Sequence, residues 1–573
     1  MRVSAEADRV VTMDRLEKFY DAVVIGSGAA GSIAVKELTE RGLEVLLLEA
    51  GRDLSEEDFI PSRKPGIPRQ GIGLMARIRG AARGQHVQAR RAFYAPQFNR
   101  FLVNDRDNPY STPPGERFLW IRGRILGGRL HSFGRVLMRM SDYDFGGASH
   151  DGCGQDWPIS YDDLAPYYDR VETLADLSGN PDGSETIPDG NYAHPAKLSS
   201  AEEEFKRQVE GRWPERRVIS WRFTRAKAER VPPGIVAARQ TGRLTTRTDA
   251  VVRRITIDER TGRADGAVFI DRITRAEHQV SARMVVLCAS TIESVRLLLG
   301  SESRAHPNGI GNSAGLLGRY FMDQCPSLTF GWVPGFTGHE LDDSAPTDPF
   351  YAPPGGIFVP RYLNLDAPGS EFARGFSFQG AIGRFPAGEE AAGFGVMGYG
   401  EMLPNFDNRI TLDRGRQDAW GLPVPHIRCA MSENERKLLR QQILTVREMV
   451  ESCGYRVNFS GSALGLDSPD VWPEANPISR LLFRREFPRS LALGAAIHEC
   501  GGARMGSDPA TSVVNEFNQV WGVPNLLVTD GSSFVSSGTV GPALTIMALT
   551  ARACEHAVSE FDDLALTRSS GNT

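Results

Sequence analysis

Residues 20–31 read YDAVVIGSGAAG, and this stretch decides the fold. The apolar run that ends at Ile25 predicts a short buried strand, and the composition of residues 29–41 predicts a helix that Gly42 ends. A second apolar run at residues 44–49 predicts another buried strand. Strand, glycine turn, helix and strand within about 30 residues make a βαβ unit, which requires a parallel sheet.

The glycines of this stretch form the pattern GxGxxG between the predicted strand and helix. Gly26 permits a tight turn, Gly28 lets backbone approach a pyrophosphate, and Gly31 lets the helix pack closely on the strand. The helix N-terminus then faces the phosphates, and the carboxylate of Glu49 can accept hydrogen bonds from ribose hydroxyls. The unit therefore predicts a dinucleotide site that includes Ala29 and Ala30, and at this point both NAD and FAD remain open.

The composition is that of an ordinary globular protein, with 41% hydrophobic and 24% charged residues and a formal net charge of −5 over 573 residues. This charge does not favour nucleic-acid binding. The seven cysteines are odd in number and contain no CxxC, so we expect neither a disulfide framework nor a metal site. Residues 1–17 lack a secretory signal, and no apolar run could span a membrane. We therefore expect a cytoplasmic protein with no membrane contact.

One stretch, residues 77–91, is locally basic and contains five arginines. Such a run is most often a solvated helix or loop face. It could also form a docking surface for an acidic partner or bind an anionic substrate.

Three later segments carry motifs in a fixed order: RGRILGG at residues 122–128, HECGGARMG at 498–506, and NLLVTDGS at 525–532 followed by GPALT at 541–545. Together with the βαβ unit, they resemble the glucose–methanol–choline (GMC) oxidoreductase family from Tyr20 to about Glu560. The segments DWPI at 156–159 and EMLP at 401–404 are similar to the branch that contains pyranose oxidases and sugar or gluconate-type dehydrogenases.

The resemblance implies an α/β fold, α+β overall. A Rossmann-like FAD-binding domain built from discontinuous segments accompanies a substrate domain with a mainly antiparallel sheet and flanking helices. Residue patterns predict strands at 244–257, 264–273 and 284–288, which fit the FAD-binding domain, and a helix over 158–178 that Ser160 caps. We assign residues 1–55, 117–157, 230–322 and 486–573 to the FAD-binding domain, 56–116 to an extended loop or lid region, and 158–229 and 323–485 to the substrate-binding domain.

The resemblance also implies that the dinucleotide is FAD. Some family members bond the flavin through a histidine four residues after the glycine pair; here Ser132 holds that position and His131 stands one place early. We therefore expect noncovalent FAD. By resemblance, the cofactor site further includes Ala50, Arg124, Gly127, Gly128, Ser132, Val252, Ala289, Ser290, Asp530, Gly531, Pro542 and Thr545.

The resemblance makes His498 the general base that takes the hydroxyl proton of an alcohol while hydride passes to flavin N5. A histidine suits this task because its ordinary pKa lies near neutral pH. The expected substrate is a sugar, glycoside or related small molecule that carries a CH–OH group, and O2 or another oxidant would accept the electrons. Oxidase or dehydrogenase activity and the oligomeric state stay open.

The sequence departs from the family at one position, where Gly541 replaces an Asn or His that orients the substrate oxygen. Either another residue supplies this role or the chemistry differs, for example as desaturation or oxidation of a non-standard substrate. A catalytically inactive flavin-binding protein is the third alternative. The residues considered as replacements are Thr539, Ser536, Ser537, His131 and His426.

Overall fold

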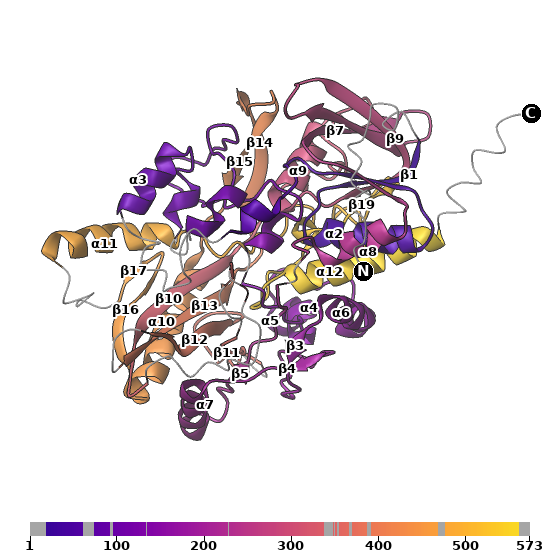
Figure 1. The fold of residues 1–573 in the computed structure, drawn as a ribbon. Helices are drawn as coiled ribbons and strands as arrows, with labels where there is room; N and C mark the ends of the chain where they lie inside the picture. The colour runs from indigo at the N-terminus through magenta and orange to yellow at the C-terminus, as the bar shows by residue number, and fades with distance from the viewer. Residues whose placement is uncertain are drawn as a thin grey trace, which may run out of the picture.

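The structure is a computed structural model that describes residues 19–60, 74–91, 96–132, 134–226, 229–336, 348, 350–351, 355–365, 369–386, 391–467 and 476–560. The segment examined for a secretory signal lies outside these residues. Two sheets lie beside each other with helices around them (Figure 1). The expected α/β class, with one mainly parallel and one antiparallel sheet, is confirmed.

The first sheet has a parallel centre in the order β19-β9-β1-β2-β6. Val24 of β1 pairs with Leu47 of β2 on one side and with Val286 of β9 on the other. These side chains are fully buried, as expected for parallel strands covered on both faces. The bounds are β1 (Tyr20–Ile25), β2 (Val45–Leu48), β6 (Leu244–Arg247), β7 (Ala250–Asp258), β8 (Arg263–Asp271), β9 (Glu277–Leu287), β18 (Gln519–Val520) and β19 (Val523–Val528).

The prediction of one strand over residues 244–257 is wrong, because the chain breaks there into β6 and β7. Asp249 adopts a left-handed conformation with φ 57°, and its carboxylate accepts a hydrogen bond from Arg272 Nε at 2.6 Å. This turn ends the parallel strand β6 and starts an antiparallel ribbon in which β7 pairs with β8 and β8 with β9. Asp can adopt this conformation more readily than most residues.

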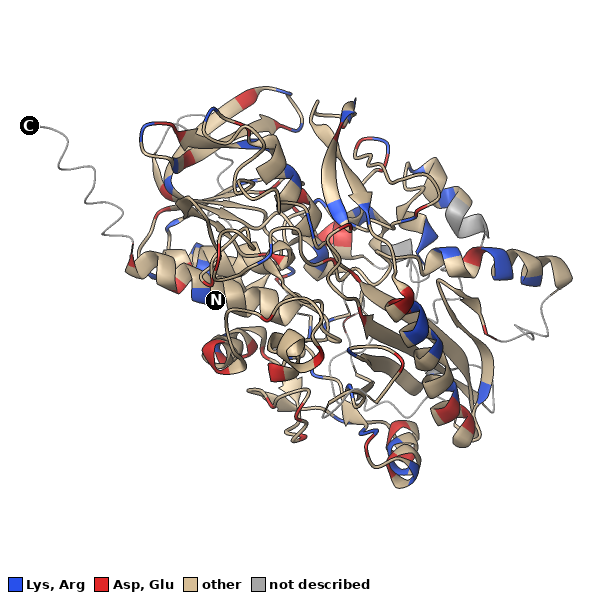
Figure 2. Cartoon of the chain, turned by 180° about the vertical axis from the view of Figure 1, so that it is seen from behind, with Lys and Arg blue, Asp and Glu red and all other residues tan. Residues whose placement is uncertain are grey.

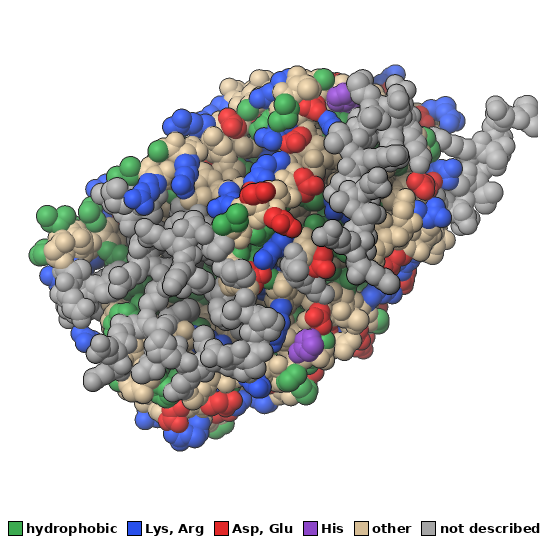
Figure 3. Space-filling model, viewed as in Figure 1, with side chains coloured by type: hydrophobic (Ala, Val, Ile, Leu, Met, Phe, Trp, Pro, Cys, Tyr) green, Lys and Arg blue, Asp and Glu red, His purple; other side chains and the backbone are tan. Residues whose placement is uncertain are grey.

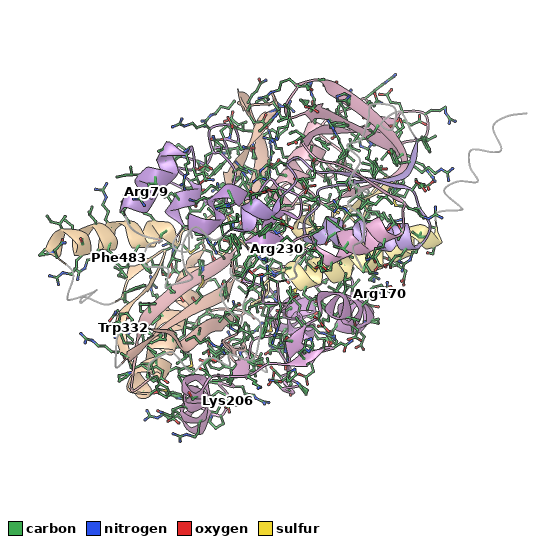
Figure 4. The ribbon with its side chains drawn as sticks, in the orientation of Figure 1. Arg79, Arg170, Lys206, Arg230, Trp332 and Phe483 are labelled. Atoms are coloured by element: carbon green, nitrogen blue, oxygen red, sulfur yellow. The ribbon has the colours of Figure 1, made fainter. Side chains whose placement is uncertain are left out.

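Helices α2 (Ala29–Glu40), α8 (Pro233–Gln240) and α12 (Ala543–Ser559) lie together beside the parallel sheet (Figure 1). Arg170 of α6 (Tyr161–Ala175) joins two of them: it contacts Glu37 of α2 at 3.1 Å and Glu555 of α12 at 2.9 Å (Figure 4). The predicted cap of α6 is confirmed, because Ser160 N donates to Asp163 Oδ2 at 2.8 Å and Ser160 Oγ accepts from Asp163 N.

The second sheet is antiparallel in the order β17-β16-β10-β13-β12-β11-β5. Helix α10 (Glu433–Ser452) packs against it through Leu438 and Met449, which share one core with Phe394 and Val396. The bounds are β5 (Ile219–Ser220), β10 (Gln324–Pro334), β11 (Ile357–Val359), β12 (Phe376–Pro386), β13 (Ala391–Glu401), β16 (Arg456–Ser462) and β17 (Gly465–Leu466).

The hairpin of β14 (Arg409–Gln417) and β15 (Pro423–Arg428) belongs to neither sheet. It lies against α9 (Thr291–Gly300), where Arg296 pairs with Asp418 at 2.8 Å. A segment assigned to the substrate domain thus packs on α9, the helix that follows β9 of the first sheet. The domain boundaries as a whole stay a prediction.

The remaining helices, strands and 3₁₀ turns lie outside the two main sheets. Helix α11 (Pro477–Ser490) is anchored by Phe483 and Phe487, whose rings lie 5.2 and 5.3 Å from that of Phe459 (Figure 4). The others are α3 (Leu74–Ala82), α4 (Asp142–Phe145), α5 (Gly147–Asp151), α7 (Ser200–Arg212), β3 (Ser178–Gly179), β4 (His194–Pro195) and 3₁₀ turns at Glu56–Phe59, Gln88–Arg90, Pro96–Phe101, Gly128–His131 and Gly531–Ser533.

The surface mixes both signs of charge: Lys and Arg stand among Asp and Glu on the helices and loops seen in Figure 2. Hydrophobic side chains gather over the free end of α11 at the left edge of Figure 3, where Ile478 is 72% exposed. Within the described ranges, no helix combines the length and the apolar character that crossing a membrane requires.

The glycine turn between β1 and α2 is built by close backbone contact. Gly26 has φ +97°, and a Cβ atom on Gly31 would lie 1.8 Å from the Gly26 carbonyl oxygen. A Cβ atom on Gly28 would have no neighbour within 4 Å. Gly31 therefore serves the packing of helix on strand, whereas Gly28 leaves space on the open side of the turn.

This difference predicts effects of different size for two matched substitutions. Gly31→Ala forces the turn apart and should lower the free energy of unfolding of the cofactor-free protein by about 1–3 kcal/mol. Gly28→Ala should change it by less than about 0.5 kcal/mol. Chemical denaturation of the two variants measures both values, and an equal loss in both would contradict this account of the turn.

Candidate active site

A cavity of about 530 Å³ lies between the two sheets. One wall is formed by the ends of β1 and β2 with the glycine turn, and the opposite wall carries Gln379, Met397 and Tyr399 from β12 and β13. Crevices at the carboxyl ends of parallel strands are the usual ligand sites of such sheets. The volume also lies in the range of small-molecule and cofactor pockets.

The structure brings most of the predicted site residues to this cavity. Three lie behind its wall. Gly31 packs in the turn, Gly127 N donates to Ser27 Oγ at 2.9 Å, and Thr545 Oγ1 lies 2.7 Å from the Tyr168 hydroxyl. The predicted residues that line the cavity are Gly26, Gly28, Ala29, Ala30, Glu49, Ala50, Arg124, Gly128, Ser132, Val252, Ala289, Ser290, His498, Asp530, Gly531 and Pro542.

Three helices begin at the cavity: α2, α9 and α12. The residues before them, Gly28, Ser290 and Pro542, make no side-chain cap hydrogen bond. Each helix therefore directs the positive end of its dipole toward the cavity without a cap from its own N-cap side chain. This arrangement favours an anionic ligand such as a phosphate.

Two arginines add hydrogen-bond donors to the same cavity. The Arg122 guanidinium lies 3.4 Å from the centre of the Trp120 ring, and burial lowers its pKa to about 10. Arg124 Nη2 pairs with Glu293 Oε1 at 2.8 Å. Within the described residues, the buried Arg122 Nε and Arg124 Nη1 have no hydrogen-bond partner. Buried donors of this kind require an acceptor, so the cavity suits a polar, negatively charged ligand.

Glu49 connects the first two glycine motifs through Ser27. Its Oε2 accepts from Ser27 Oγ at 2.5 Å, and its Oε1 accepts from Gly51 N at 2.7 Å. Ser27 Oγ in turn accepts from Gly127 N. Burial raises the pKa of Glu49, and these hydrogen bonds oppose the rise. The role of Ser27 could not be predicted from the motif, because any residue satisfies the x of GxGxxG.

The imidazole of His498 is oriented by Gln324, the first residue of β10. His498 Nδ1 lies 2.6 Å from Gln324 Oε1, while Gln324 Nε2 donates to the carbonyls of Ser537, Gly538 and Val540 at 3.2, 2.8 and 2.8 Å. Carbonyls only accept hydrogen bonds, so the amide nitrogen must face them and the amide oxygen must face the imidazole. Nδ1 therefore carries the proton, and Nε2 keeps its lone pair.

The surroundings keep this imidazole neutral. Burial, together with the charges of Arg129 and Arg91, lowers the pKa of His498 to about 3. His498 lines the cavity, and a Cβ atom on Gly541 would lie 3.4 Å from Nε2. A neutral nitrogen acceptor thus stands beside the space that Gly541 leaves.

None of the suggested replacements for the side chain absent at Gly541 lines the cavity. His131 Nε2 lies 2.9 Å from the Leu126 carbonyl, and His426 Nδ1 lies 2.8 Å from Ser111 Oγ. Ser536 Oγ accepts from Trp157 Nε1, and Ser537 Oγ accepts from Met402 N. Thr539 is buried, and its carbonyl accepts from Ser377 Oγ.

Two residues that sequence reasoning missed line the cavity with His498: Tyr399 and Arg91. The Tyr399 ring lies 5.1 Å from the imidazole, centre to centre. Met397 and Tyr399 are two residues apart on β13, a spacing that places both side chains on the same face of the strand. This spacing could have been recognised in the sequence. Arg91 ends the basic stretch, but nothing in the sequence distinguished it from its neighbours. Within the described part of the chain, no three His, Cys, Asp or Glu residues are grouped so as to hold a metal ion.

Comparison with known proteins identifies relatives of the chain. Residues 20–319 and 404–550 match two family models, each described as GMC oxidoreductase. The chain is 28% identical to 2-methyl-1,2-propanediol dehydrogenase of Mycolicibacterium austroafricanum, over 95% of this chain and 96% of the relative. It is 27% identical to paromamine 6'-oxidase of Streptomyces fradiae, over 94% and 91%. A solved structure of an Aspergillus oryzae formate oxidase variant is similar in fold, with TM-score 0.64, 15% identity, and coverage of 96% and 99%.

The contacts of His498 predict its protonation state. In protein labelled with nitrogen-15 histidine, the His498 ring should show a protonated Nδ1 and a bare Nε2, and it should not titrate between about pH 5 and pH 8. The His498→Gln variant identifies the signal. A titration midpoint near the ordinary histidine value would contradict the effect of burial and of the two arginines.

Proposed function

The chain belongs to the GMC oxidoreductase family, and from this we propose that it oxidises the CH–OH group of a small polyol, sugar or sugar-bearing molecule with FAD as cofactor and His498 as base. The neutral Nε2 of His498, held toward the cavity by Gln324, is the observation that carries the proposal. An alcohol oxidation needs an acceptor for the hydroxyl proton at this kind of position.

The residues of the cavity fit FAD. The N-termini of α2, α9 and α12 suit its negatively charged pyrophosphate. So do Arg122 Nε and Arg124 Nη1, which find no hydrogen-bond partner among the described residues. Space at Gly28 lets a ligand lie against the backbone, and Glu49 presents a carboxylate for ribose hydroxyls. Val252, Ala289, Ser290, Asp530, Gly531 and Pro542, also on the wall, complete the proposed binding residues.

FAD, when bound, accepts the hydride that leaves the carbinol carbon. The protein's part is to hold the alcohol and receive its proton on His498 Nε2. The cations Arg129 and Arg91 disfavour a charged imidazolium and favour negative charge on a nearby oxygen. The proton is therefore best transferred as the carbonyl forms, when the substrate oxygen loses its electron density to the new double bond.

The substrate class rests on the relatives and on the polarity of the cavity. One relative is named for a branched diol and another for paromamine, so hydroxyl-bearing small molecules are the shared feature. Tyr399 and Gln379 place polar groups on the wall opposite the glycine turn. Seven free cysteines support a reducing compartment, and we propose a cytoplasmic protein that delivers electrons to O2 or another oxidant.

Anaerobic mixing of the FAD-loaded protein with a panel of polyols, sugars, glycosides and aromatic alcohols tests the proposal. At least one alcohol should bleach the flavin absorption. The His498→Gln variant should retain FAD and reduce it about 10²–10⁴-fold more slowly. Bleaching only by non-alcohols would favour altered chemistry linked to Gly541, and no bleaching by any compound would favour an inactive flavin-binding protein.

The environment of His131 predicts that FAD is held without a covalent bond. Its imidazole packs against Phe59 and Phe101, with ring centres at 5.6 and 5.8 Å, and lies behind the cavity wall. Ser132 lines the cavity instead. Acid precipitation of the yellow protein should therefore leave all flavin absorption in the supernatant; flavin that stays in the pellet would contradict the prediction.

A further inference from the structure

Gly541 leaves the base without the neighbouring donor that an Asn or His would supply. The nearest atoms to a Cβ at this position are Nε2 and Cε1 of His498, at 3.4 and 3.7 Å. These are ordinary van der Waals contacts, and φ at Gly541 lies outside the left-handed region. The site could therefore hold a side chain here. The absence of a side chain enlarges the cavity beside His498. Other groups must therefore bind the reacting oxygen of the substrate.

Tyr399 reaches this end of the cavity from β13. Its ring is tilted by 35° to the imidazole of His498 with the centres 5.1 Å apart. Its hydroxyl donates to Met397 Sδ at 3.4 Å. A thioether sulfur is a weak acceptor, so the hydroxyl can exchange this contact for a better oxygen acceptor when a substrate enters.

Arg91, the last residue of the basic stretch at 77–91, also lines the cavity. Its Nε donates to the Ala495 carbonyl at 3.0 Å, which fixes the side chain beside the loop that carries His498. Its charge acts on both His498 and Tyr399. Burial lowers the pKa of Arg91 to about 10, so it remains a cation at neutral pH.

Of the two arginines whose charges lower the pKa of His498, Arg129 has the larger effect, and it lies on another side of the cavity. Arg129 Nη1 pairs with Glu499 Oε2 at 2.6 Å, and its Nη2 donates to Ser290 Oγ at 3.0 Å. Arg129 therefore serves the cofactor side of the cavity, where Ser290 begins α9. Arg91 instead donates to Ala495 in the loop that carries His498, and its charge acts on Tyr399.

We propose that Arg91, together with the Tyr399 hydroxyl, binds the reacting oxygen of the substrate and takes over the donor role that the chain lacks at Gly541. The inference rests on the proposed alcohol oxidation. As the hydroxyl proton moves to His498, negative charge grows on the oxygen and then passes into the carbonyl bond while hydride leaves the carbon. A fixed cation and a hydroxyl donor stabilise that charge where it develops.

The test compares four FAD-loaded proteins: wild type, Arg91→Met, Tyr399→Phe and Arg253→Met. Arg253 is an exposed arginine of β7 paired with Glu277, and its variant controls for the loss of one positive charge. For an alcohol that reduces the wild type, Arg91→Met should lower the limiting rate of anaerobic flavin reduction about 10²-fold. Tyr399→Phe should lower it about 10-fold. The concentration for half-maximal rate should change little, because the contact strengthens only as charge develops.

Two further readouts separate direct contact from a structural role. Gly541→Asn introduced into Arg91→Met should restore part of the lost rate, because it returns a donor beside His498. In the substrate-free protein, the His498 pKa followed by histidine NMR should rise in Arg91→Met and stay at the wild-type value in Arg253→Met.

Full-rate reduction in Arg91→Met would overturn the proposal, as would a rate loss accompanied by loss of bound FAD. A large rise in the half-maximal concentration at unchanged limiting rate would also overturn it, since Arg91 would then anchor a remote part of the substrate. If no alcohol reduces the wild type, the proposed function itself fails, and the NMR comparison still decides whether Arg91 acts on His498.

Discussion

The side-chain amide of Gln324 is the contact on which the site depends. It joins the first residue of β10 to three carbonyls between Ser537 and Val540 and to His498 Nδ1. One amide therefore ties the antiparallel sheet to the two C-terminal motif loops. Because its nitrogen can only face the carbonyls, it also decides which imidazole nitrogen carries the proton. Gln324 therefore determines both where the imidazole of His498 lies and which of its nitrogens is protonated.

Electrostatics link cofactor binding to catalysis in this cavity. Helices α2, α9 and α12 point their N-termini into it, and Arg122 and Arg124 add donors. These positive helix ends and donors suit an anionic cofactor. Burial, with the charges of Arg129 and Arg91, keeps the imidazole of His498 neutral, and the two cations favour negative charge on a bound oxygen. A site built in this way does not need a strong base, because it stabilises the oxygen that loses the proton.

Local patterns predicted the parts of the fold that local forces determine. The bounds of β1, α2 and β2 followed from an apolar run, a glycine turn and helical composition, and the cap of α6 followed from Ser160. The break at Asp249 was missed, because threonines that favour strands precede it and an apolar run follows it, and only the left-handed backbone reveals it. Gln324, Tyr399 and Arg91 were also missed. They come from separate segments that meet only when the two sheets pack together, and no spacing in the sequence encodes that meeting.

The most direct test of the account is a crystal structure of the protein with FAD bound. The account predicts that the flavin ring occupies the part of the cavity lined by His498, Gly541 and Tyr399, with His498 Nε2 facing it and Nδ1 still bonded to Gln324. A structure in which FAD lies elsewhere, or in which the imidazole has turned away from the ring and left Gln324, would contradict it.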